Sequence, residues 1–393
     1  MYELSDYLAM VDDPRRTSAY IAALRATVRP GDHVLELGTG FGFFAVHAAL
    51  AGAAHVWAIE PNDAVALGPA LAAQHGVGDR ITFLQRRAEQ ITLPNLADVL
   101  LEDLRGVFPL MGARSGILAD ARARLLRTDA RHIALRDHLV IAPCAAAHVT
   151  SARETAHDAS NDASHHASHH APLDLTTIRA RAAQGWQRVR ASALRPLAAS
   201  ARWATLELTA AIPTDVRGTV QVTVTQDGAL QGLGGWFDAE LAGGASFGSG
   251  PEAGASVYDC AWFPLERTVP VRVGDGIAIA MRATHDGSDY VWRWEVTVSS
   301  ATGDVRDRQV ATDLGARLLA PERLARRAST AVPPRDDAVH ALAALLAQVD
   351  GARSLGEIAH TVRAAFPRRF PTEREALDFA ARELARLVEG DPA

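Results

Sequence analysis

The stretch Val34-Leu35-Glu36-Leu37-Gly38-Thr39-Gly40-Phe41-Gly42 decides how the first part of this 393-residue chain is expected to fold. It begins as a mostly apolar run, ends in glycines at alternate positions, and is followed directly by the helix-forming run FFAVHAALAG. The apolar run predicts a buried strand, and the glycines allow a tight turn at which backbone amides can approach a ligand closely. Because a helix N-terminus carries partial positive charge, this turn is a candidate ligand site.

Outward from this turn, strand-like and helix-like runs alternate. The strand-like runs are HVLEL, HVWAIE, ITFLQ, DVLLED and HLVIAP, and the helix-like runs include AVALGPALAAQHG and GILADARARLL. Such alternation predicts a parallel, doubly wound α/β domain of the Rossmann-like kind over residues 31–148. Residues 1–30, where Asp12 or Asp13 precedes Pro14, are predicted to form short helices that cover the ligand site.

The rest of the chain contains three segments whose composition or hydrophobic pattern differs from that of the first domain. Residues 149–172 are a Ser-, Ala-, His- and Asp-rich tract, which predicts a flexible loop. Residues 173–300 are expected to form an antiparallel β-barrel preceded by a helical arm, because apolar and polar residues alternate between Trp203 and Ser299. Residues 331–393 are predicted to form a small helical domain with helices at about 337–349, 355–365 and 373–388, two of which start with the capping-box pairs Ser354/Glu357 and Thr372/Glu375.

The composition narrows the possible partners. With 48% apolar and 22% charged residues, the chain is expected to be globular, and its net charge of −6 gives no reason to expect nucleic-acid binding. The first residues lack the apolar run of a signal peptide, and no stretch has the length and apolarity of a membrane span, so a cytoplasmic location is expected. The run His165-His166-Ala167-Ser168-His169-His170 is either a flexible insertion or a metal site, and no metal is expected in the reaction.

The glycine turn does not match the usual dinucleotide-binding pattern, and two acidic residues indicate a different ligand. A dinucleotide fingerprint has its third glycine at position 43, but this chain has Phe43 there. Glu36 lies inside the motif, and Glu60 follows the next predicted strand, where a carboxylate can accept hydrogen bonds from both hydroxyls of a ribose. A doubly wound domain that binds another nucleotide remains the alternative at this point.

Several motifs together resemble those of the protein arginine methyltransferases, which are class I S-adenosylmethionine-dependent enzymes. The run from Val34 to Asp63 resembles their first two cofactor motifs, and DRITFLQRRAEQITLP resembles the third. The loop spelling EDLRGVFPL resembles a bacterial branch of the family. The resemblance continues through the spacing of Met10, Asp13, Arg16 and Tyr20 and through three barrel motifs, Gly235–Glu240, Phe247–Glu252 and Trp262–Leu265.

This resemblance implies a cofactor and its contacts. The cofactor is expected to be S-adenosyl-L-methionine, with Arg16 holding its carboxylate, Glu36 orienting its amino group and Glu89 accepting from the adenine amine. A homodimer is also implied, through a helical arm matched by residues 173–195 with Trp186 as anchor. The residues expected to bind the cofactor are Met10, Arg16, Glu36, Gly38, Gly40, Gly42, Glu60, Ala88 and Glu89.

The acceptor site departs from the family. Arginine methyltransferases hold the substrate guanidinium between two glutamates on one loop, and here the first matches Asp103, or Glu102 in a shifted register, while the second matches Gly112. Losing one carboxylate of a buried ion pair costs about 3–5 kcal/mol, so arginine is expected to be a poor acceptor. The family's Thr-His-Trp loop is replaced by Ser256-Val257-Tyr258. The predicted catalytic residues are Asp103 and Glu102, and the predicted substrate contacts are Arg105, Ser256 and Tyr258, although Arg105 could instead pair with Glu102 or Asp103.

The C-terminal segment resembles the winged-helix domains that recognise peptides in ribosomal peptide pathways, through the spacing LL…DG.RSL.EIA. A stabilising helical bundle is the alternative. The chain is therefore expected to methylate a peptide or protein side chain, in such a pathway. The alternatives are a small-molecule N- or O-methyltransferase and a catalytically idle family member that acts as a binding scaffold.

Overall fold

The computed structural model describes residues 2–110, 114–146, 178, 181, 184–254, 256–287, 289–316, 330–332 and 336–388. The chain divides into two compact units, Met1–Arg317 and Leu318–Ala393. Within the described ranges no helix is long and apolar enough to span a bilayer.

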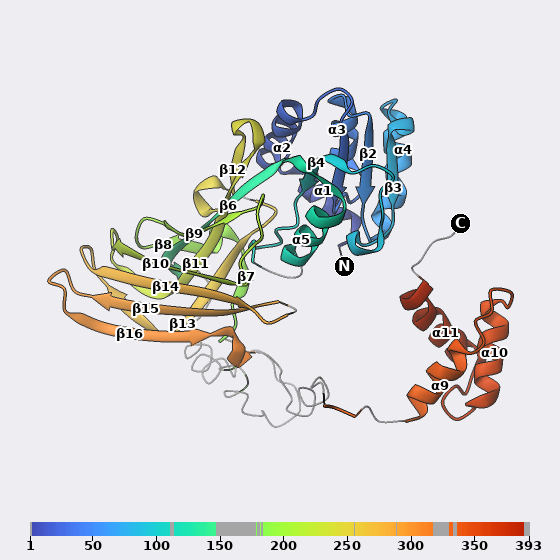
Figure 1. Cartoon of the computed structure of the whole chain (residues 1–393). Helices are drawn as coiled ribbons and strands as arrows, with labels where there is room; N and C mark the ends of the chain where they lie inside the picture. Colours follow the sequence, from blue (N-terminus) through green and yellow to red (C-terminus); the bar gives the residue numbers. More distant parts are fainter. Residues whose placement is uncertain are drawn as a thin grey trace. The chain divides into compact units, whose positions relative to one another are not determined.

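A parallel five-stranded sheet forms the first part of the larger unit, drawn in blue to teal in Figure 1. The strand order is β3-β2-β1-β4-β5, and every neighbouring pair is parallel. The sheet confirms the predicted Rossmann-like fold. Its strands are β1 (His33–Leu37), β2 (His55–Ile59), β3 (Ile81–Leu84), β4 (Ala97–Glu102) and β5 (Leu126–His132).

Helices accompany this sheet. α2 packs against α3, and α3 packs against α4. The predicted start of α2 is confirmed, because the Asp13 side chain accepts hydrogen bonds from the amides of Arg15 and Arg16 while Pro14 occupies the first helical position. The helices are α1 (Leu4–Asp12), α2 (Pro14–Thr27), α3 (Phe43–Leu50), α4 (Gly68–Gln74) and α5 (Arg114–Arg124).

The last strand of the parallel sheet is not the one that the sequence pattern indicates. The run HLVIAP, expected in this sheet, lies in β6 (Ala134–Ala146), which pairs antiparallel with β9 and β11 of the following domain. The fifth parallel strand is β5 instead, whose sequence LRTDARH carries little apolar character because the strand lies at the sheet edge. The antiparallel domain therefore begins near residue 134.

The two antiparallel sheets together form the predicted barrel, drawn in green to orange in Figure 1. Strand β9 lies beside β10, and β13 lies beside β16, which joins the two sheets at both edges. The barrel continues through β16, beyond the expected end at residue 300. Its further strands are β7 (Gln187–Val189), β8 (Leu194–Pro196), β9 (Ala201–Glu207), β10 (Asp215–Thr223), β11 (Gly228–Leu241), β12 (Ser246–Gly248), β13 (Cys260–Val271), β14 (Gly276–His285), β15 (Tyr290–Ser299) and β16 (Val305–Thr312).

The helical arm expected before the barrel is only partly within the described residues. Its second half is not helical, because β7 and a short 3-10 turn at Ala191–Ala193 occupy residues 187–193. Trp186, the predicted dimer anchor, is half-buried and packs against the barrel core of its own chain. A role for this side chain between subunits therefore receives no support from its position.

The described residues of the smaller unit, 330–332 and 336–388, contain three helices around a separate apolar core. They are α9 (Asp337–Leu346), α10 (Leu355–Ala365) and α11 (Glu373–Val388), close to the predicted ranges. Both predicted capping boxes are present. The amide of Glu357 donates to the Ser354 hydroxyl, and the amide of Glu375 donates to the Thr372 hydroxyl.

Candidate active site

The turn between β1 and α3 adopts a conformation that requires glycine. Gly38, Gly40 and Gly42 have φ angles of 76°, 57° and 90°, a left-handed region that other residues disfavour. A Cβ atom on Gly40 would lie 2.7 Å from the Tyr7 ring, and one on Gly42 would lie 2.5 Å from the Phe83 ring. The glycines therefore allow α1 and β3 to lie directly against the turn.

A pocket of about 620 Å³ opens at the carboxyl ends of β1, β2 and β4. Its size and its place match the cofactor sites of open α/β sheets. Gly42 does not line it and instead caps the N-terminus of α3. The other predicted cofactor residues all line it, namely Met10, Arg16, Glu36, Gly38, Gly40, Glu60, Ala88 and Glu89.

Two buried carboxylates lie at the ends of neighbouring strands in this pocket. The oxygens of Glu60 accept hydrogen bonds from the amides of Gly40 and Asn62, each at 3.0 Å, which fixes the carboxylate after β2. Glu36 is 3% exposed and accepts a hydrogen bond from the Thr39 hydroxyl at 2.6 Å. Burial raises the pKa of Glu36 to about 7. Glu36 therefore changes charge near neutral pH.

We expect the affinity for S-adenosylmethionine to fall by up to about tenfold per pH unit as the pH drops below about 7. The family resemblance places Glu36 at the ammonium group of the methionine moiety, and a protonated, neutral Glu36 would not attract that group. Isothermal titration calorimetry between about pH 6 and about pH 8 measures this dependence. The Glu36→Gln variant should bind S-adenosylmethionine weakly, with an affinity that does not depend on pH in this range. The Glu60→Gln variant should also bind it weakly, but its affinity should keep the pH dependence of the wild type. A flat wild-type profile would contradict the assignment of Glu36.

Arg16 connects the N-terminal helices to the acceptor end of the pocket. Its Nε donates to Asp103 Oδ2 at 2.6 Å and to the Tyr258 hydroxyl at 3.0 Å, and its Nη1 donates to the Met10 carbonyl at 2.9 Å. Its Nη2 has no hydrogen-bond partner among the residues that the structure describes. Arg16 therefore retains one nitrogen with which it can bind a carboxylate in the pocket.

A chain of alternating charges has both of its ends at the pocket and its middle in the interior. Neighbours in this chain are joined by hydrogen-bonded ion pairs of 2.6–2.7 Å. All six side chains are at most 9% exposed, so solvent screens these pairs little. Positive and negative charges balance along it. In order, the chain consists of Glu102, Arg114, Asp137, Arg105, Asp103 and Arg16.

Both carboxylates predicted to be catalytic are therefore already bound by arginines of this chain. Arg114 donates to Oε1 of Glu102 at 2.7 Å and to Oε2 at 3.2 Å. Burial alone would raise the pKa of Asp103, but the guanidinium groups of Arg16 and Arg105 hold it below its ordinary value. Gly112, the match to the family's second glutamate, lies outside the described residues.

Arg105 is placed differently from the predicted substrate contact. It is fully buried and does not line the pocket, and it pairs with Asp103 and Asp137 at 2.7 Å each. Its guanidinium carbon lies 5.6–5.9 Å from the ring centres of Tyr20, Phe237 and Phe247. The prediction of Arg105 as a substrate contact is thus corrected, and the alternative of an internal ion pair holds.

Ser256 and Tyr258 line the acceptor end of the pocket. The Tyr258 hydroxyl donates a short hydrogen bond to Asp103 Oδ2. The Ser256 hydroxyl and the amide of Val257 both donate to Asp13 Oδ2, at 3.3 and 3.2 Å. Because Asp13 also caps α2, this carboxylate fixes the barrel segment against the N-terminal helices.

Sequence reasoning missed Arg114 and Asp137, which complete the charge chain. A signal for Asp137 existed, because it is a charged residue inside the long, largely apolar strand run of β6. Arg114 stands at the start of α5 among other charged residues and carries no comparable signal. The His-rich tract lies outside the described residues, and within them no group of three or more His, Cys, Asp or Glu side chains forms a metal site.

No family model matches the chain. A relative from Streptomyces achromogenes subsp. streptozoticus named arginine N(omega)-methyltransferase is 24% identical over 283 residues, which cover 70% of this chain and 75% of the relative. The crystal structure of Arabidopsis thaliana protein arginine methyltransferase 10 has the same fold, with a TM-score of 0.66, 18% identity, and coverage of 79% of this chain and 98% of that one.

A second solved structure is the enzyme-prozyme heterotetrameric complex of Trypanosoma brucei PRMT1 with AdoHcy. It has a TM-score of 0.66 and 15% identity, and the match covers 79% of this chain and 98% of that one. In these relatives a Rossmann-like sheet is followed by a barrel, as it is here. The chain is therefore similar in sequence to an arginine N(omega)-methyltransferase and shares the fold of protein arginine methyltransferases.

Proposed function

We propose that this enzyme transfers the methyl group to an uncharged nitrogen or hydroxyl of a peptide or protein side chain. The observation that carries this proposal is the charge balance at the acceptor end of the pocket. Glu102 and Asp103 are each paired with buried arginines at 2.6–2.7 Å. A substrate guanidinium would have to displace one of these internal cations, whereas a neutral acceptor needs no free pair of carboxylates.

The chemistry requires little beyond position and charge. S-adenosylmethionine, when bound, supplies a methyl group on a positively charged sulfur. Asp103 and the Tyr258 hydroxyl lie at the pocket wall and can orient the acceptor by hydrogen bonds. A neutral nitrogen becomes positive as the new bond forms, and the ionised Asp103 stabilises that charge. Its lowered pKa makes Asp103 a weak base, so its contribution is electrostatic.

The cofactor contacts are part of the same proposal. Glu60 binds the ribose hydroxyls, Ala88 and Glu89 bind the adenine, and Glu36 lies at the amino group. Arg16, which donates a hydrogen bond to the Met10 carbonyl, holds the methionine carboxylate, and Met10 lines the pocket beside it. Support comes from the shared pocket, which all of these residues line. Gly38 and Gly40 contribute by allowing the backbone to approach the cofactor closely.

The guanidinium nitrogen of arginine is the second candidate acceptor. The Streptomyces relative, whose match covers 70% of this chain, is named for arginine rather than for protein arginine, which favours a small-molecule acceptor. The family resemblance also favours arginine in general. Arginine is placed second because Glu102 and Asp103 are already paired with arginines of the charge chain. The idle-scaffold alternative is not retained, since the relatives are named as methyltransferases.

A place in a ribosomal peptide pathway is a further part of the proposal. It is supported by the independent core of α9, α10 and α11 and by apolar side chains on their surface, of which Val339 is 45% exposed and Leu346 is 43% exposed. No strand occurs in the described residues of this unit, so a peptide would meet helices rather than a sheet edge.

We also propose a homodimer and a cytoplasmic location. The homodimer fits the multimeric Trypanosoma complex, and the location fits the absence of a membrane-spanning helix in the described residues.

The acceptor can be identified by mass spectrometry with a cofactor that carries a deuterated methyl group. Free arginine, an Arg/Gly-rich peptide and peptides that present His, Asn, Ser or Tyr are incubated separately with the enzyme. We expect label on a neutral acceptor and little label on either arginine substrate. The Glu60→Ala variant, which lacks the proposed ribose contact, gives the background. Efficient dimethylation of the Arg/Gly-rich peptide would restore arginine as the peptide acceptor, and efficient labelling of free arginine would establish the small-molecule alternative.

A further inference from the structure

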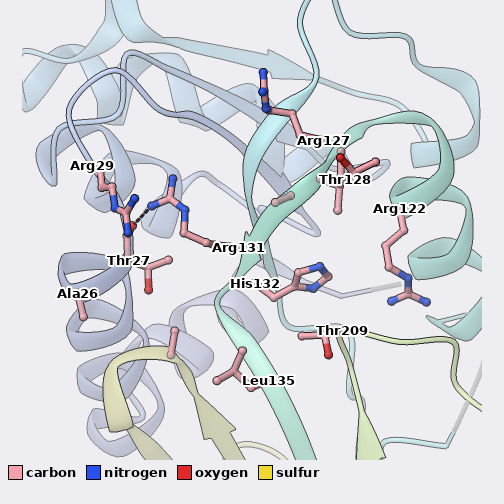
Figure 2. A pocket seen from close by; sticks show the side chains of 13 residues that line it. Ala26, Thr27, Arg29, Arg122, Arg127, Thr128, Arg131, His132, Leu135 and Thr209 are labelled. Atoms are coloured by element: carbon pink, nitrogen blue, oxygen red, sulfur yellow. Dashed lines mark hydrogen bonds between the residues drawn. The ribbon is translucent and has the colours of Figure 1, made fainter.

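A second cleft, about 630 Å³ in volume, lies along strand β5 and shares no lining residue with the cofactor pocket (Figure 2). It is formed by the C-terminal end of α2, by α5 and by the start of the barrel. Six of the seven β5 residues line it, and Asp129 is the exception. The cleft therefore follows the strand over almost its whole length.

The lining of this cleft is positively charged. It contains Arg29, Arg122, Arg127 and Arg131 and no acidic side chain, although the whole chain has a net charge of −6. Thr27, Thr128 and Thr209 add hydroxyl groups and His132 adds an imidazole. This composition favours an anionic ligand.

Two of the four guanidinium groups form no ion pair with a carboxylate in the described part of the chain. Arg131 pairs with Asp32 at 2.6 Å, and Arg127 lies 3.4 Å from both Asp98 and Asp129. Among the described residues, Arg29 and Arg122 form no ion pair, and the Nη1 of Arg122 donates only to the backbone carbonyl of Leu208, at 2.9 Å. The Nη2 of Arg122 is buried without a hydrogen-bond partner. The positive charge of the cleft is therefore only partly balanced by nearby carboxylates.

The backbone of β5 offers the cleft a second means of binding. In the described sheet β5 pairs with β4 on one side and is the last strand on the other. An edge strand presents unpaired amides and carbonyls that an extended peptide can bind. In Figure 2, Arg29, Thr27 and Arg131 lie on the α2 side of the strand, and Arg122, His132 and Thr209 lie on the α5 side. Cationic side chains thus flank the strand on both sides.

We propose that this cleft binds an extended acidic peptide segment, which adds to the free edge of β5 as a further strand. Successive side chains of an added strand point to opposite faces of the sheet. Acidic residues at alternate positions would then meet Arg29 and Arg131 on one face or Arg122 on the other. Charged residues on an edge strand also discourage pairing with other chains, but a cleft whose lining includes arginines and no acidic side chain repels basic strands and selects acidic ones.

Fluorescence anisotropy can test this docking site on the full-length protein without cofactor or turnover, so the result is independent of the proposed acceptor. The probes are a fluorescein-labelled peptide that alternates Glu and Val, its Lys/Val counterpart, and a copy of the acidic peptide with methylated backbone nitrogens. We expect the acidic peptide to bind, the basic one not to bind, and the N-methylated copy to bind at least about tenfold more weakly.

Variants separate a specific site from general charge attraction. Arg29→Gln combined with Arg122→Gln should weaken binding of the acidic peptide by about tenfold. The matched control combines Arg202→Gln with Arg217→Gln, two exposed arginines on the barrel strands β9 and β10, and should leave binding unchanged. Equal binding of the N-methylated copy would overturn strand addition. Equal loss in both double variants, or no binding of the acidic peptide, would overturn the site.

Discussion

Asp137→Asn is expected to lower the free energy of unfolding of the larger unit by about 3–5 kcal/mol. Asp137 is fully buried in β6, where it accepts hydrogen bonds from Arg105 and Arg114 at 2.7 Å each. The amide would leave two guanidinium groups in the interior without their shared counter-charge. Because β6 belongs to the barrel while Arg105 belongs to the loop after β4, the change also weakens the connection between the two domains.

Urea unfolding followed by tryptophan fluorescence is suited to this measurement, because all seven tryptophans lie before residue 318. The matched control is Asp215→Asn. Asp215 is a barrel carboxylate that is also hydrogen-bonded to arginine, but its side chain is 33% exposed and the Arg282 side chain is 51% exposed. Such a surface pair contributes about 0–1 kcal/mol. If both substitutions cost the same, the charge chain around Asp137 does not stabilise the fold.

The parts of the fold that could be predicted from the sequence are those determined by local chemistry. The glycine turn after β1, the cap of α2 by Asp13 and the capping box at Ser354 each depend on residues a few positions apart. Their geometry follows from backbone conformation and from hydrogen bonds to nearby amides. The cofactor pocket was predicted for the same reason, since parallel strands bring their carboxyl ends to one edge of the sheet.

The parts that could not be predicted depend on partners far apart in the sequence. Strand β5 carries charged residues because it lies at an edge, so its pattern does not resemble a buried strand. Strand β6 is largely buried, so its apolar run looks like a parallel strand although it pairs antiparallel in the barrel. The ion pair between Arg16 and Asp103 joins residues that are 87 positions apart. No periodicity in the sequence encodes such a pairing.

Asp103→Asn is expected to reduce the rate of methyl transfer by about 10²–10³-fold, the size of effect seen when one group that stabilises transition-state charge is lost. Asp103 receives hydrogen bonds from Arg16, Arg105 and Tyr258 and lies at the pocket wall. Its lowered pKa keeps it ionised throughout the neutral range, so the wild-type rate should not titrate with this group. The amide is neutral at every pH and cannot stabilise positive charge on the acceptor.

Glu102→Gln is the matched comparison, because it also removes one buried negative charge next to an arginine. Glu102 directs both oxygens to Arg114 and to the amide of Leu104, so its loss should act mainly on stability and should lower the transfer rate less. Single-turnover rates at saturating cofactor, measured below the melting temperature of each variant, separate chemistry from folding and from binding. A larger rate loss in Glu102→Gln than in Asp103→Asn would reverse the assignment. Glu102, rather than Arg16, would then mark the end of the charge chain that faces the acceptor.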